Sequence, residues 1–393
     1  MQENENTKIE RAIQAATKSG RFFCKFVSAN DVGLTGAHQE GIYLSKDAWD
    51  LFFPGVERIR GTNIENLIRI HLDGHYRFES RLIYYGQGTR NEYRITRFWT
   101  NSPFQKEQHI GDLIIFIPLD PDNFYIYLLD TDKEIESFIE HFSLSLINNS
   151  ATYTALKGQE NDLARTLEEI IEEKAKKFTQ FPDTTYMAEV SRVIFEQTNK
   201  VNTLQPDKDI LKWIETEYAL FRAIERNVYK SYLDRPFGEL EPLLNFASSA
   251  LNRRKSRAGK SLEHHIDFMF RQLSIPFSHP GRSEGNKKPD FLLPSNEAYA
   301  EYTFDNEKLI FLGAKTTCKD RWRQVLNEAS RIPQKHLFTL QQGITINQLD
   351  EMQEVNLTLV VPEPLHKFYP KSHQHRIWTV QEFINYAKEK YRY

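Results

Sequence analysis

The sequence predicts a multi-domain α/β protein with a β-rich N-terminal part and a mixed α/β C-terminal part. Three observations support this: a length of 393 residues, short aromatic and β-branched segments before residue 130, and alternating helix and strand patterns later in the chain. A chain of this length exceeds what one hydrophobic core usually serves. We expect one domain over 1–150, a linker carrying a helix over 151–182, and a second domain over 183–393.

The N-terminal part contains six segments rich in aromatic and β-branched residues, separated by Gly, Asn, Asp and Pro. They are FFCKFV, GIYLS, RFESRLIYY, YRITRFW, DLIIFIPL and NFYIYLLD. This composition and spacing are typical of strands in a barrel or sandwich. A helix is expected over 134–147. A second, charged helix, LARTLEEIIEEKAKKF, has acids first and bases last, as the helix dipole favours. It either links the two parts or packs on a domain.

Helices come first after residue 183, and helix and strand then alternate. The expected helices are TTYMAEVSRVIFEQTNK, KDILKWIETEYALFRAIERNVYKSYL, SLEHHIDFMFRQL, DRWRQVLNEASRI and VQEFINYAKEKY. The expected strands are PDFLLP, EKLIFLGAKTT, KHLFTL and NLTLVVP. This alternation predicts a mixed sheet with helices on its faces.

Composition limits the possible functions. The net charge is −3 and the pI about 6.5, so nucleic-acid binding would need local basic patches. The two cysteines, Cys24 and Cys318, are too far apart in the chain for a disulfide framework or a zinc site of local spacing. The N-terminus lacks a signal-peptide core, and no apolar run is long enough to span a membrane. We therefore expect a cytoplasmic protein without a membrane partner.

A lysine ends an apolar strand in KLIFLGAK. Alternation places Phe311, Gly313 and Lys315 on one face, and lysine is seldom buried without a partner. Asp290 begins the neighbouring strand, so the two strands would present an aspartate and a lysine at one sheet edge. In the following helix, Glu328 is expected on the face that looks back toward this pair, together with Arg321 and Val325.

This set suits phosphodiester hydrolysis. Asp290 and Glu328 would hold Mg²⁺, while Lys315 would stabilise charge on the phosphate or orient water. Nucleases of the PD-(D/E)xK type carry a second acid two residues before the lysine, where this chain has Gly313. Glu328 would have to supply that carboxylate. A surface ion-pair cluster is the alternative.

A basic stretch precedes this region. Five of the eight residues from 253 to 260 are basic: Arg253, Arg254, Lys255, Arg257 and Lys260. Such a cluster commonly contacts the phosphates of a duplex, although a solvated basic turn is equally compatible. The GKS within it is no P-loop, because Arg254 stands where that motif needs glycine. Ser261 is expected to cap the next helix, with Glu263 in its first turn.

Several long motifs resemble one family. KSRAGKSLE, EGNKKPDFLLPS and KTTCKDRWRQVLNEA resemble the EcoRII type II restriction endonucleases, as do SANDVGLTGAHQEGIY, TRNEYRITR and LVVPEPLHKFYP. The resemblance spans nearly the whole chain. It implies a C-terminal restriction-endonuclease-like domain that dimerises and uses Mg²⁺. The expected substrate is double-stranded DNA with CC/GG-type sites and a central A·T pair (CCWGG), cut to 5′-phosphate ends.

The resemblance also assigns roles to residues. The catalytic set would be Asp290, Lys315 and Glu328, with Glu263 as a supporting acid. Base reading would fall to Lys319, Asp320 and Arg321, whose donors and acceptor suit adjacent G·C pairs. A cognate methyltransferase would act on the same site without having to bind this chain.

The N-terminal part resembles a B3-like pseudobarrel that binds a second copy of the site as effector. The family's contact positions fall on His38, Tyr43, Arg90, Glu92 and Arg94. Gly88 and Tyr93 replace family lysines, so effector binding would be weaker or altered. In the family this domain also covers the catalytic cleft, which implies autoinhibition.

Two other functions are compatible with parts of the sequence. One is a B3-type DNA-binding protein whose nuclease half is degenerate, and the complete set of Asp290, Lys315 and Glu328 argues against it. The other is a repair nuclease of the same fold without strict sequence preference, which the triplet from Lys319 to Arg321 argues against.

Overall fold

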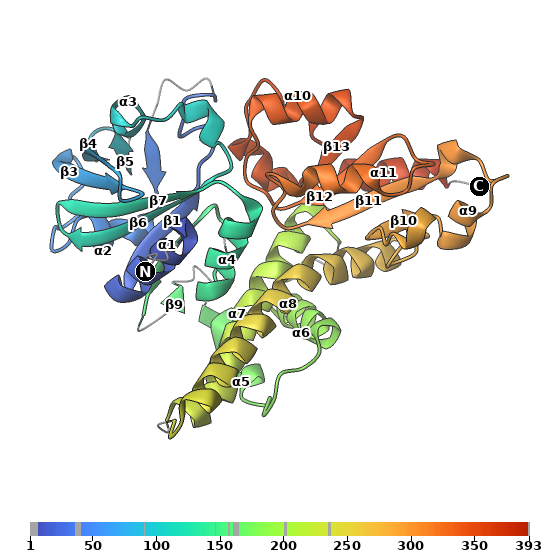
Figure 1. Cartoon of the computed structure of the whole chain (residues 1–393), viewed down its shortest axis with the longest axis horizontal. Helices are drawn as coiled ribbons and strands as arrows, with labels where there is room; N and C mark the ends of the chain where they lie inside the picture. The colour runs from blue at the N-terminus through green and yellow to red at the C-terminus, as the bar shows by residue number, and fades with distance from the viewer. Residues whose placement is uncertain are drawn as a thin grey trace, which may run out of the picture. The chain divides into compact units, whose positions relative to one another are not determined.

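The structure is a computed structural model, and it describes residues 7–35, 41–89, 91–145, 147–155, 158–159, 165–199, 203–234 and 237–391. The chain forms two compact units (Figure 1). The first comprises Met1–Asn161, Gln341–Leu349 and Lys367–Gln374. The second comprises Asp162–Leu340, Asp350–His366 and His375–Tyr393.

The first unit is built on one sheet, to which nine strands contribute among the described residues. In sheet order they are β2 (Ile42–Leu44), β5 (Glu92–Thr96), β4 (Tyr76–Tyr85), β3 (Ile64–Leu72), β7 (Asn123–Leu129), β6 (Leu113–Asp120), β1 (Arg21–Phe26), β8 (Ser150–Thr154) and β9 (Gly158–Gln159). Neighbours are antiparallel except β3 and β7, which are parallel. All six segments expected as strands contribute to this sheet, which confirms the β-rich N-terminal part.

Around β1, both faces of this sheet are buried. Along β1, Phe23 packs into one apolar cluster, while Phe22 and Cys24 pack into another on the opposite face, as the two-residue period of a strand requires. The second cluster includes residues of α1 (Lys8–Ser19) and α4 (Asp132–Phe142). The short helices α2 (Trp49–Phe52) and α3 (Phe98–Asn101) complete the unit.

Helix α1 has clear start and stop signals in the sequence. Thr7 and Glu10 form a capping box at its start, and Gly20 ends it in the left-handed region with φ +69°. These are the usual start and stop signals of a helix. The expected helix over 134–147 is present as α4, which begins and ends a few residues earlier.

The span expected as a linker, 151–182, contributes to both units. Strand β8 pairs with β1 in the first sheet. Helix α5 (Arg165–Ala175) packs within the second unit, where Ile171 is buried against residues of two longer helices. The charged helix therefore packs on a domain, because its apolar face has partners there.

The second unit contains the mixed sheet expected from the alternating pattern. Its order is β10 (Phe291–Leu293), β11 (Ile310–Lys315), β12 (Lys335–Thr339) and β13 (Leu357–Val360). Strands β10 and β11 are antiparallel, whereas β11, β12 and β13 run parallel. The helices are α6 (Thr184–Thr198), α7 (Pro206–Leu233), α8 (Leu240–Gln272), α9 (Asn296–Ala300) and α11 (Val380–Lys390), and α10 (Ile346–Glu354) lies between β12 and β13 in the chain.

Helix α8 corrects one expectation. It continues through the basic stretch 253–260, so a solvated turn there and a helix cap at Ser261 are both wrong. Ser261 lies inside the helix and donates a hydrogen bond from Oγ to Glu217 Oε2 on α7 at 2.9 Å. His265, one turn later, contacts the same oxygen at 3.0 Å. These buried contacts to α7 keep this stretch helical despite Gly259.

Two segments of the C-terminal half pack inside the first unit. Gln341 Nε2 donates to the Gly111 carbonyl at 3.1 Å, and the Ala29 N–H donates to the Phe368 carbonyl at 3.0 Å. The Tyr369 hydroxyl, fully buried, donates to the Gln341 carbonyl at 2.6 Å and so ties the two segments together. Among the helices of the described residues, none combines the length and apolar character that crossing a bilayer requires.

Candidate active site

Two paired strands bring an aspartate and a lysine into contact. Phe291 pairs with Leu312 across β10 and β11, so Asp290, one residue before β10, lies beside the end of β11. Asp290 Oδ2 accepts hydrogen bonds from the Lys315 ammonium at 3.1 Å and from the Ala314 N–H at 2.7 Å. The structure thus joins Asp290 and Lys315 as the strand pattern predicts. Their side chains are 18% and 26% exposed, which leaves the pair accessible to a substrate.

Glu328 joins this pair electrostatically. Burial, followed by the nearby Asp290 carboxylate, raises the pKa of Glu328 to about 7, while Lys315 and Lys335 act in the opposite direction. A carboxylate responds in this way when a second carboxylate lies close to it in a partly desolvated place. The charges of Asp290 and Lys315 therefore act on Glu328, as the sequence-based grouping expects.

The local structure around Glu328 differs from the expected helix. Arg321–Asn327 forms a 3-10 helix, and Glu328 follows it in extended conformation with φ −98° and ψ 148°. The shared helix face of Arg321, Val325 and Glu328 is therefore wrong. The Lys335 ammonium donates to the carbonyls of Glu328 and Ala329, groups that a longer helix would use for its own hydrogen bonds.

Two side chains from the preceding segment accept hydrogen bonds from the backbone just after Glu328. The Ser330 N–H donates to Glu284 Oε1 at 2.9 Å, and the Ala329 N–H donates to Ser283 Oγ at 3.4 Å. Ala329 itself has φ +48°, a left-handed value that interrupts a right-handed helix. Tertiary contacts thus accompany the end of the helix at Asn327 and the extended conformation of Glu328.

Packing explains why the acid is absent from position 313. A Cβ atom on Gly313 would lie 3.0 Å from Val325 Cγ1 and 3.3 Å from Leu337 Cδ1. The segment that carries Glu328 therefore fills the space that a side chain at 313 would need. The carboxylate is supplied instead from beyond this segment.

A second acid and a histidine border the same place. Glu263, on α8, lies with Oε2 3.5 Å from His279 Nε2. Burial and then the Asp290 carboxylate raise the pKa of Glu263, whereas His279 and Lys315 lower it. His279 Nδ1 is 2.8 Å from the Asp290 carbonyl. Because a carbonyl only accepts, Nδ1 carries the proton and Nε2 faces Glu263.

Sequence reasoning missed His279. It lies in SHPG, which matches no catalytic spacing, and its ring stacks on Phe291 with centroids 4.5 Å apart. Only the packing of β10 against this loop places the histidine between Glu263 and Asp290. Its position beside two carboxylates makes it part of the candidate site.

Comparison with known proteins decides the family. Family models described as "Restriction endonuclease EcoRII, N-terminal" and "EcoRII C terminal" match residues 16–157 and 221–384. The chain is 34% identical over 389 residues to the "Type II restriction enzyme EcoRII" of Escherichia coli, covering 95% of each chain. The chain belongs to the EcoRII family of type II restriction enzymes. It is accordingly a site-specific deoxyribonuclease.

Two further similarities accompany this one. The "Type II restriction enzyme SsoII" of Shigella sonnei is 25% identical over 157 residues, covering 37% of this chain and 50% of that protein. The solved structure "Metal-depleted Ecl18kI in complex with uncleaved DNA" is 20% identical with a TM-score of 0.44, covering 57% of this chain and 83% of that one.

In this EcoRII-family chain, the three residues expected to read bases have different exposures. Lys319 is 7% exposed, Asp320 is exposed, and Arg321 is half-buried. The Arg321 guanidinium donates from Nη2 to Thr317 Oγ1 at 3.2 Å. The three begin four residues after Lys315, so they lie close to the candidate catalytic lysine in the sequence.

The expected backbone contacts divide into two groups. Arg253 donates to the Tyr229 hydroxyl at 2.8 Å, and Arg254 makes two hydrogen bonds to Glu225, at 2.8 and 2.7 Å. Arg257 is 3% exposed and lies over the Tyr218 ring at 3.8 Å. Lys255 and Lys260 are exposed on α8. The two lysines are therefore the members of the cluster best placed to meet a phosphate.

The expected effector contacts lie in the first unit, and His38 and Arg90 fall outside the described residues. Tyr43 and Glu92 are half-buried on neighbouring strands. Arg94 is 4% exposed, donates to the Gly41 carbonyl at 3.3 Å and pairs with Glu92 at 3.5 Å. Arg94 thus has internal partners that sequence patterns did not indicate.

The carboxylates of Asp290 and Glu328 suit a cation that keeps several of its waters better than a cation bound by protein ligands alone. Over the described ranges, no three His, Cys, Asp or Glu side chains are grouped so that they hold a metal ion by themselves. Mg²⁺ typically keeps several waters and takes one or two carboxylates. Because Asp290 raises the pKa of Glu328, a divalent cation between them would favour the ionised form of both. Asp290 and Glu328 therefore fit the expected metal ligands.

Proposed function

We propose that this enzyme cleaves double-stranded DNA at CC/GG-type sites, with CCWGG as the expected sequence, and leaves 5′-phosphate ends with Mg²⁺ as cofactor. The observation that supports this most is the contact of Asp290 with Lys315 at the edge of the mixed sheet, beside Glu328 and Glu263. Restriction-endonuclease relatives over both parts of the chain support the proposal.

Each residue has a distinct role in the proposed hydrolysis. Asp290 and Glu328 hold the hydrated cation, which when bound polarises the phosphate and lowers the pKa of its water. Lys315 donates to a non-bridging phosphate oxygen or to the attacking water, and Asp290 fixes its ammonium. The water oxygen bonds to phosphorus and gives up a proton to solvent, the bond from phosphorus to the 3′ oxygen breaks, and that oxygen takes a proton from solvent water. Glu263 supports the site as a further acid.

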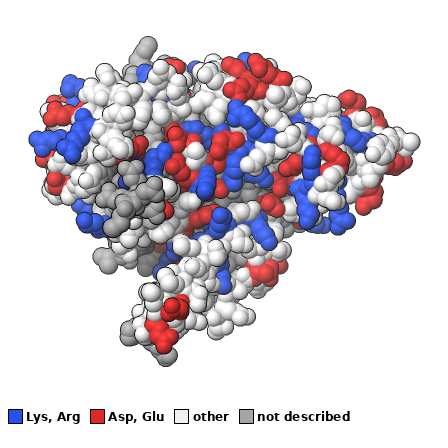
Figure 2. Space-filling model, in the orientation of Figure 1, with Lys and Arg blue, Asp and Glu red and all other residues white. Residues whose placement is uncertain are grey.

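Recognition is proposed to use the segment after Lys315. Arg321 and Lys319 have donors for guanine O6 and N7, and Asp320 can accept from cytosine N4. Lys255 and Lys260 on α8 are proposed to meet phosphates. Figure 2 shows Lys and Arg mixed with Asp and Glu over the visible face, so attraction to DNA depends on such local groups. Cleavage of both strands is proposed to need a homodimer with one active site per strand.

The first unit is proposed to be a B3-like domain that binds a second copy of the site as effector, through His38, Tyr43, Arg90, Glu92 and Arg94. Autoinhibition of cleavage is proposed with it. The match of the "Restriction endonuclease EcoRII, N-terminal" family model to residues 16–157 supports this assignment. A methyltransferase acting on the same site is the proposed counterpart in the cell.

A plasmid digest tests the nuclease proposal. Unmethylated plasmid is incubated with and without Mg²⁺, using the natural chain and Asp290→Ala, and the fragment ends are sequenced. We expect discrete fragments that need both Mg²⁺ and Asp290, because the variant loses a metal ligand and the partner of Lys315. Lys308→Ala, an exposed lysine before β11, is the matched control and should cut normally. Full activity of Asp290→Ala would overturn the site assignment.

A further inference from the structure

A buried ion pair lies beneath the proposed effector-binding region of the first unit. The Lys25 ammonium on β1 lies 2.7 Å from Asp31 Oδ2 and donates to Asp31 Oδ1 at 2.8 Å. Lys25 is 2% exposed and Asp31 is 0% exposed. Taking two charges out of water costs several kcal/mol per ion, and a buried pair is weak evidence of stabilisation. The groups that the ion pair binds therefore indicate its role better than a gain in stability does.

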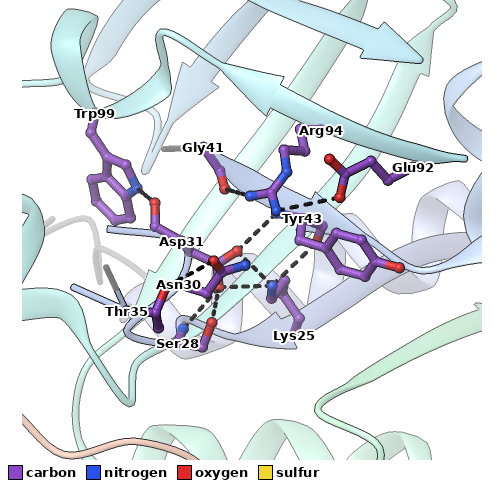
Figure 3. Close-up of polar contacts among 10 residues, drawn as sticks. All are labelled: Lys25, Ser28, Asn30, Asp31, Thr35, Gly41, Tyr43, Glu92, Arg94 and Trp99. Atoms are coloured by element: carbon purple, nitrogen blue, oxygen red, sulfur yellow. Dashed lines mark hydrogen bonds and ion pairs between the residues drawn. The ribbon is translucent and has the colours of Figure 1, made fainter. Parts of the chain in front are cut away.

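The Asp31 carboxylate holds both ends of one segment. At the start, Oδ2 accepts from the Ser28 N–H at 2.8 Å and from the Ser28 hydroxyl at 2.7 Å. At the far end, Oδ1 accepts from the Tyr43 N–H at 2.8 Å. One buried side chain thus joins residue 28 to residue 43 (Figure 3).

Lys25 holds the other backbone group of the same tyrosine. Its ammonium donates to the Tyr43 carbonyl at 3.1 Å, so the ion pair binds both the N–H and the carbonyl of Tyr43. The Tyr43 ring centroid lies 5.8 Å from the Lys25 ammonium and 5.6 Å from the Arg94 guanidinium carbon. Figure 3 shows Tyr43 between these two cations.

The backbone of Asp31 and Gly41 is held as well. The Trp99 indole N–H donates to the Asp31 carbonyl at 3.1 Å, and the Gly41 N–H donates to the same carbonyl at 3.2 Å. The Gly41 carbonyl accepts from Arg94. Gly41 has φ +127°, and a Cβ there would lie 2.7 Å from the Ile95 carbonyl oxygen. Gly41, two residues before Tyr43, is therefore fixed closely against β5.

We propose that Asp31, with Lys25 as its counter-ion, is a positioning residue that holds Tyr43 in the conformation that binds effector DNA. The inference rests on the proposed effector function of the first unit. Asp31 is buried and does not itself touch DNA. It acts through Tyr43, whose backbone N–H it binds.

The test measures how an effector duplex stimulates cleavage by the full-length enzyme. A single-site plasmid is the substrate, and a short duplex carrying the same site is titrated in trans. The half-saturating effector concentration and the plateau rate are measured separately. For Asp31→Asn we expect the half-saturating concentration to rise about tenfold or more, which corresponds to losing one hydrogen bond to a charged group. The plateau rate should stay within about twofold.

A matched control and a second variant separate positioning from stability. Asp73→Asn changes another aspartate of the same unit, one that accepts from the Leu128 N–H at 3.2 Å, and it should leave both readouts unchanged. In Lys25→Met/Asp31→Leu, apolar side chains replace the ion pair, a change that folded proteins often tolerate without loss of stability. Ser28 and Tyr43 still lose their acceptor, so the half-saturating concentration should rise in this variant as well.

Three outcomes would overturn the proposal. Half-saturation within twofold of the natural chain in both variants would show that Asp31 does not position Tyr43. A fall in plateau rate with unchanged half-saturation would show a purely structural role. Absence of stimulation in the natural chain would overturn the proposed effector function, and this inference with it. That last result appears without any substitution, so the two failures are distinguishable.

Discussion

Three carboxylates and one ammonium share the candidate active site, and their mutual influence is the main feature at the scale of single residues. Lys315 is bonded to Asp290, while burial and Asp290 raise the pKa of both Glu263 and Glu328. Without a cation, the site holds more negative charge than Lys315 balances. The free energy of unfolding of the metal-free protein should therefore depend on pH.

Glu328→Gln should stabilise the metal-free protein at high pH. The pKa of Glu328 is about 7 in the folded chain against 4.5 for the free side chain. The folded state therefore binds the proton more tightly, and the free energy of unfolding falls as the pH rises from about 4.5 to about 7. Thermal unfolding without divalent cations should show a higher Tm for the variant at about pH 8, and no difference near pH 4.5.

The control for this titration is Glu354→Gln, which changes an exposed glutamate of the same unit. It should show no such pH-dependent difference. Adding Mg²⁺ should raise the Tm of the natural chain more than that of Glu328→Gln. An equal effect of Mg²⁺ on both proteins would argue against Glu328 as a metal ligand.

Arg321→Ala tests base reading at the same scale. If Arg321 contacts a guanine edge, its loss should cost about 1–3 kcal/mol of discrimination at one base pair. Binding is measured on duplexes substituted one base pair at a time, with Arg323→Ala as control. Arg323 is exposed and pairs with Glu351. Equal weakening on every duplex would make Arg321 a phosphate contact.

At the scale of elements, the 3-10 helix Arg321–Asn327 and strand β11 are fitted to each other. Val325 packs over Gly313, and Glu328 is the extended residue that follows the 3-10 helix. Nucleases that have the second acid two residues before the lysine need room for a side chain at the position of Gly313. The 3-10 helix and β11 do not leave that room. The position of the acid is therefore a property of the packed elements and not of β11 alone.

Gly313→Ala should destabilise the protein, because its Cβ would lie 3.0 Å from Val325 Cγ1. Overpacking of this kind typically costs about 1–3 kcal/mol, and urea unfolding measures it. Combining it with Val325→Ala, which makes room, should recover part of the loss. If Gly313→Ala alone has unchanged stability, the close fit between these elements is not significant.

At the scale of the whole molecule, the boundary between the two units decides which helices a truncated fragment keeps. Helix α5 belongs to the second unit, and two segments after residue 340 belong to the first. A fragment that begins near residue 162 therefore keeps α5 with its partners on α6 and α7. A cut near residue 180 would remove α5 and expose the apolar surface around Ile194 and Leu220.

Deleting residues 1–161 should leave a folded nuclease that cleaves a single-site plasmid faster than the full chain, because the proposed autoinhibition is removed. The fragment also exposes residues that are buried in the first unit, among them Ile344 and Tyr369, so its Tm should be lower. Circular dichroism confirms folding, and initial rates are compared under the same conditions. Slower cleavage by a folded fragment would argue against autoinhibition.

The sequence predicted features that depend on short-range patterns. Period-two alternation and a preceding strand that begins after a proline were sufficient to group Asp290 with Lys315, and their contact is present. Glu328 was grouped with them through a helix face, whereas the structure ends the helix at Asn327. Asp290 and Lys315 nevertheless act on the pKa of Glu328. His279 has no local signal, because its place beside Glu263 depends on a loop packed against β10.

By itself, the sequence determined the two-part organisation, the β-rich first part, the mixed α/β second part and the family. These features depend on hydrophobic periodicity, turn residues and long motifs, all of which are patterns of residues close together in the sequence. Only the tertiary structure decided that Arg94 and Arg257 are buried, that α8 continues through Ser261, and that Asp31 joins Ser28 to Tyr43. These depend on which distant side chains supply a partner or fill a space, and that information exists only once the chain has packed.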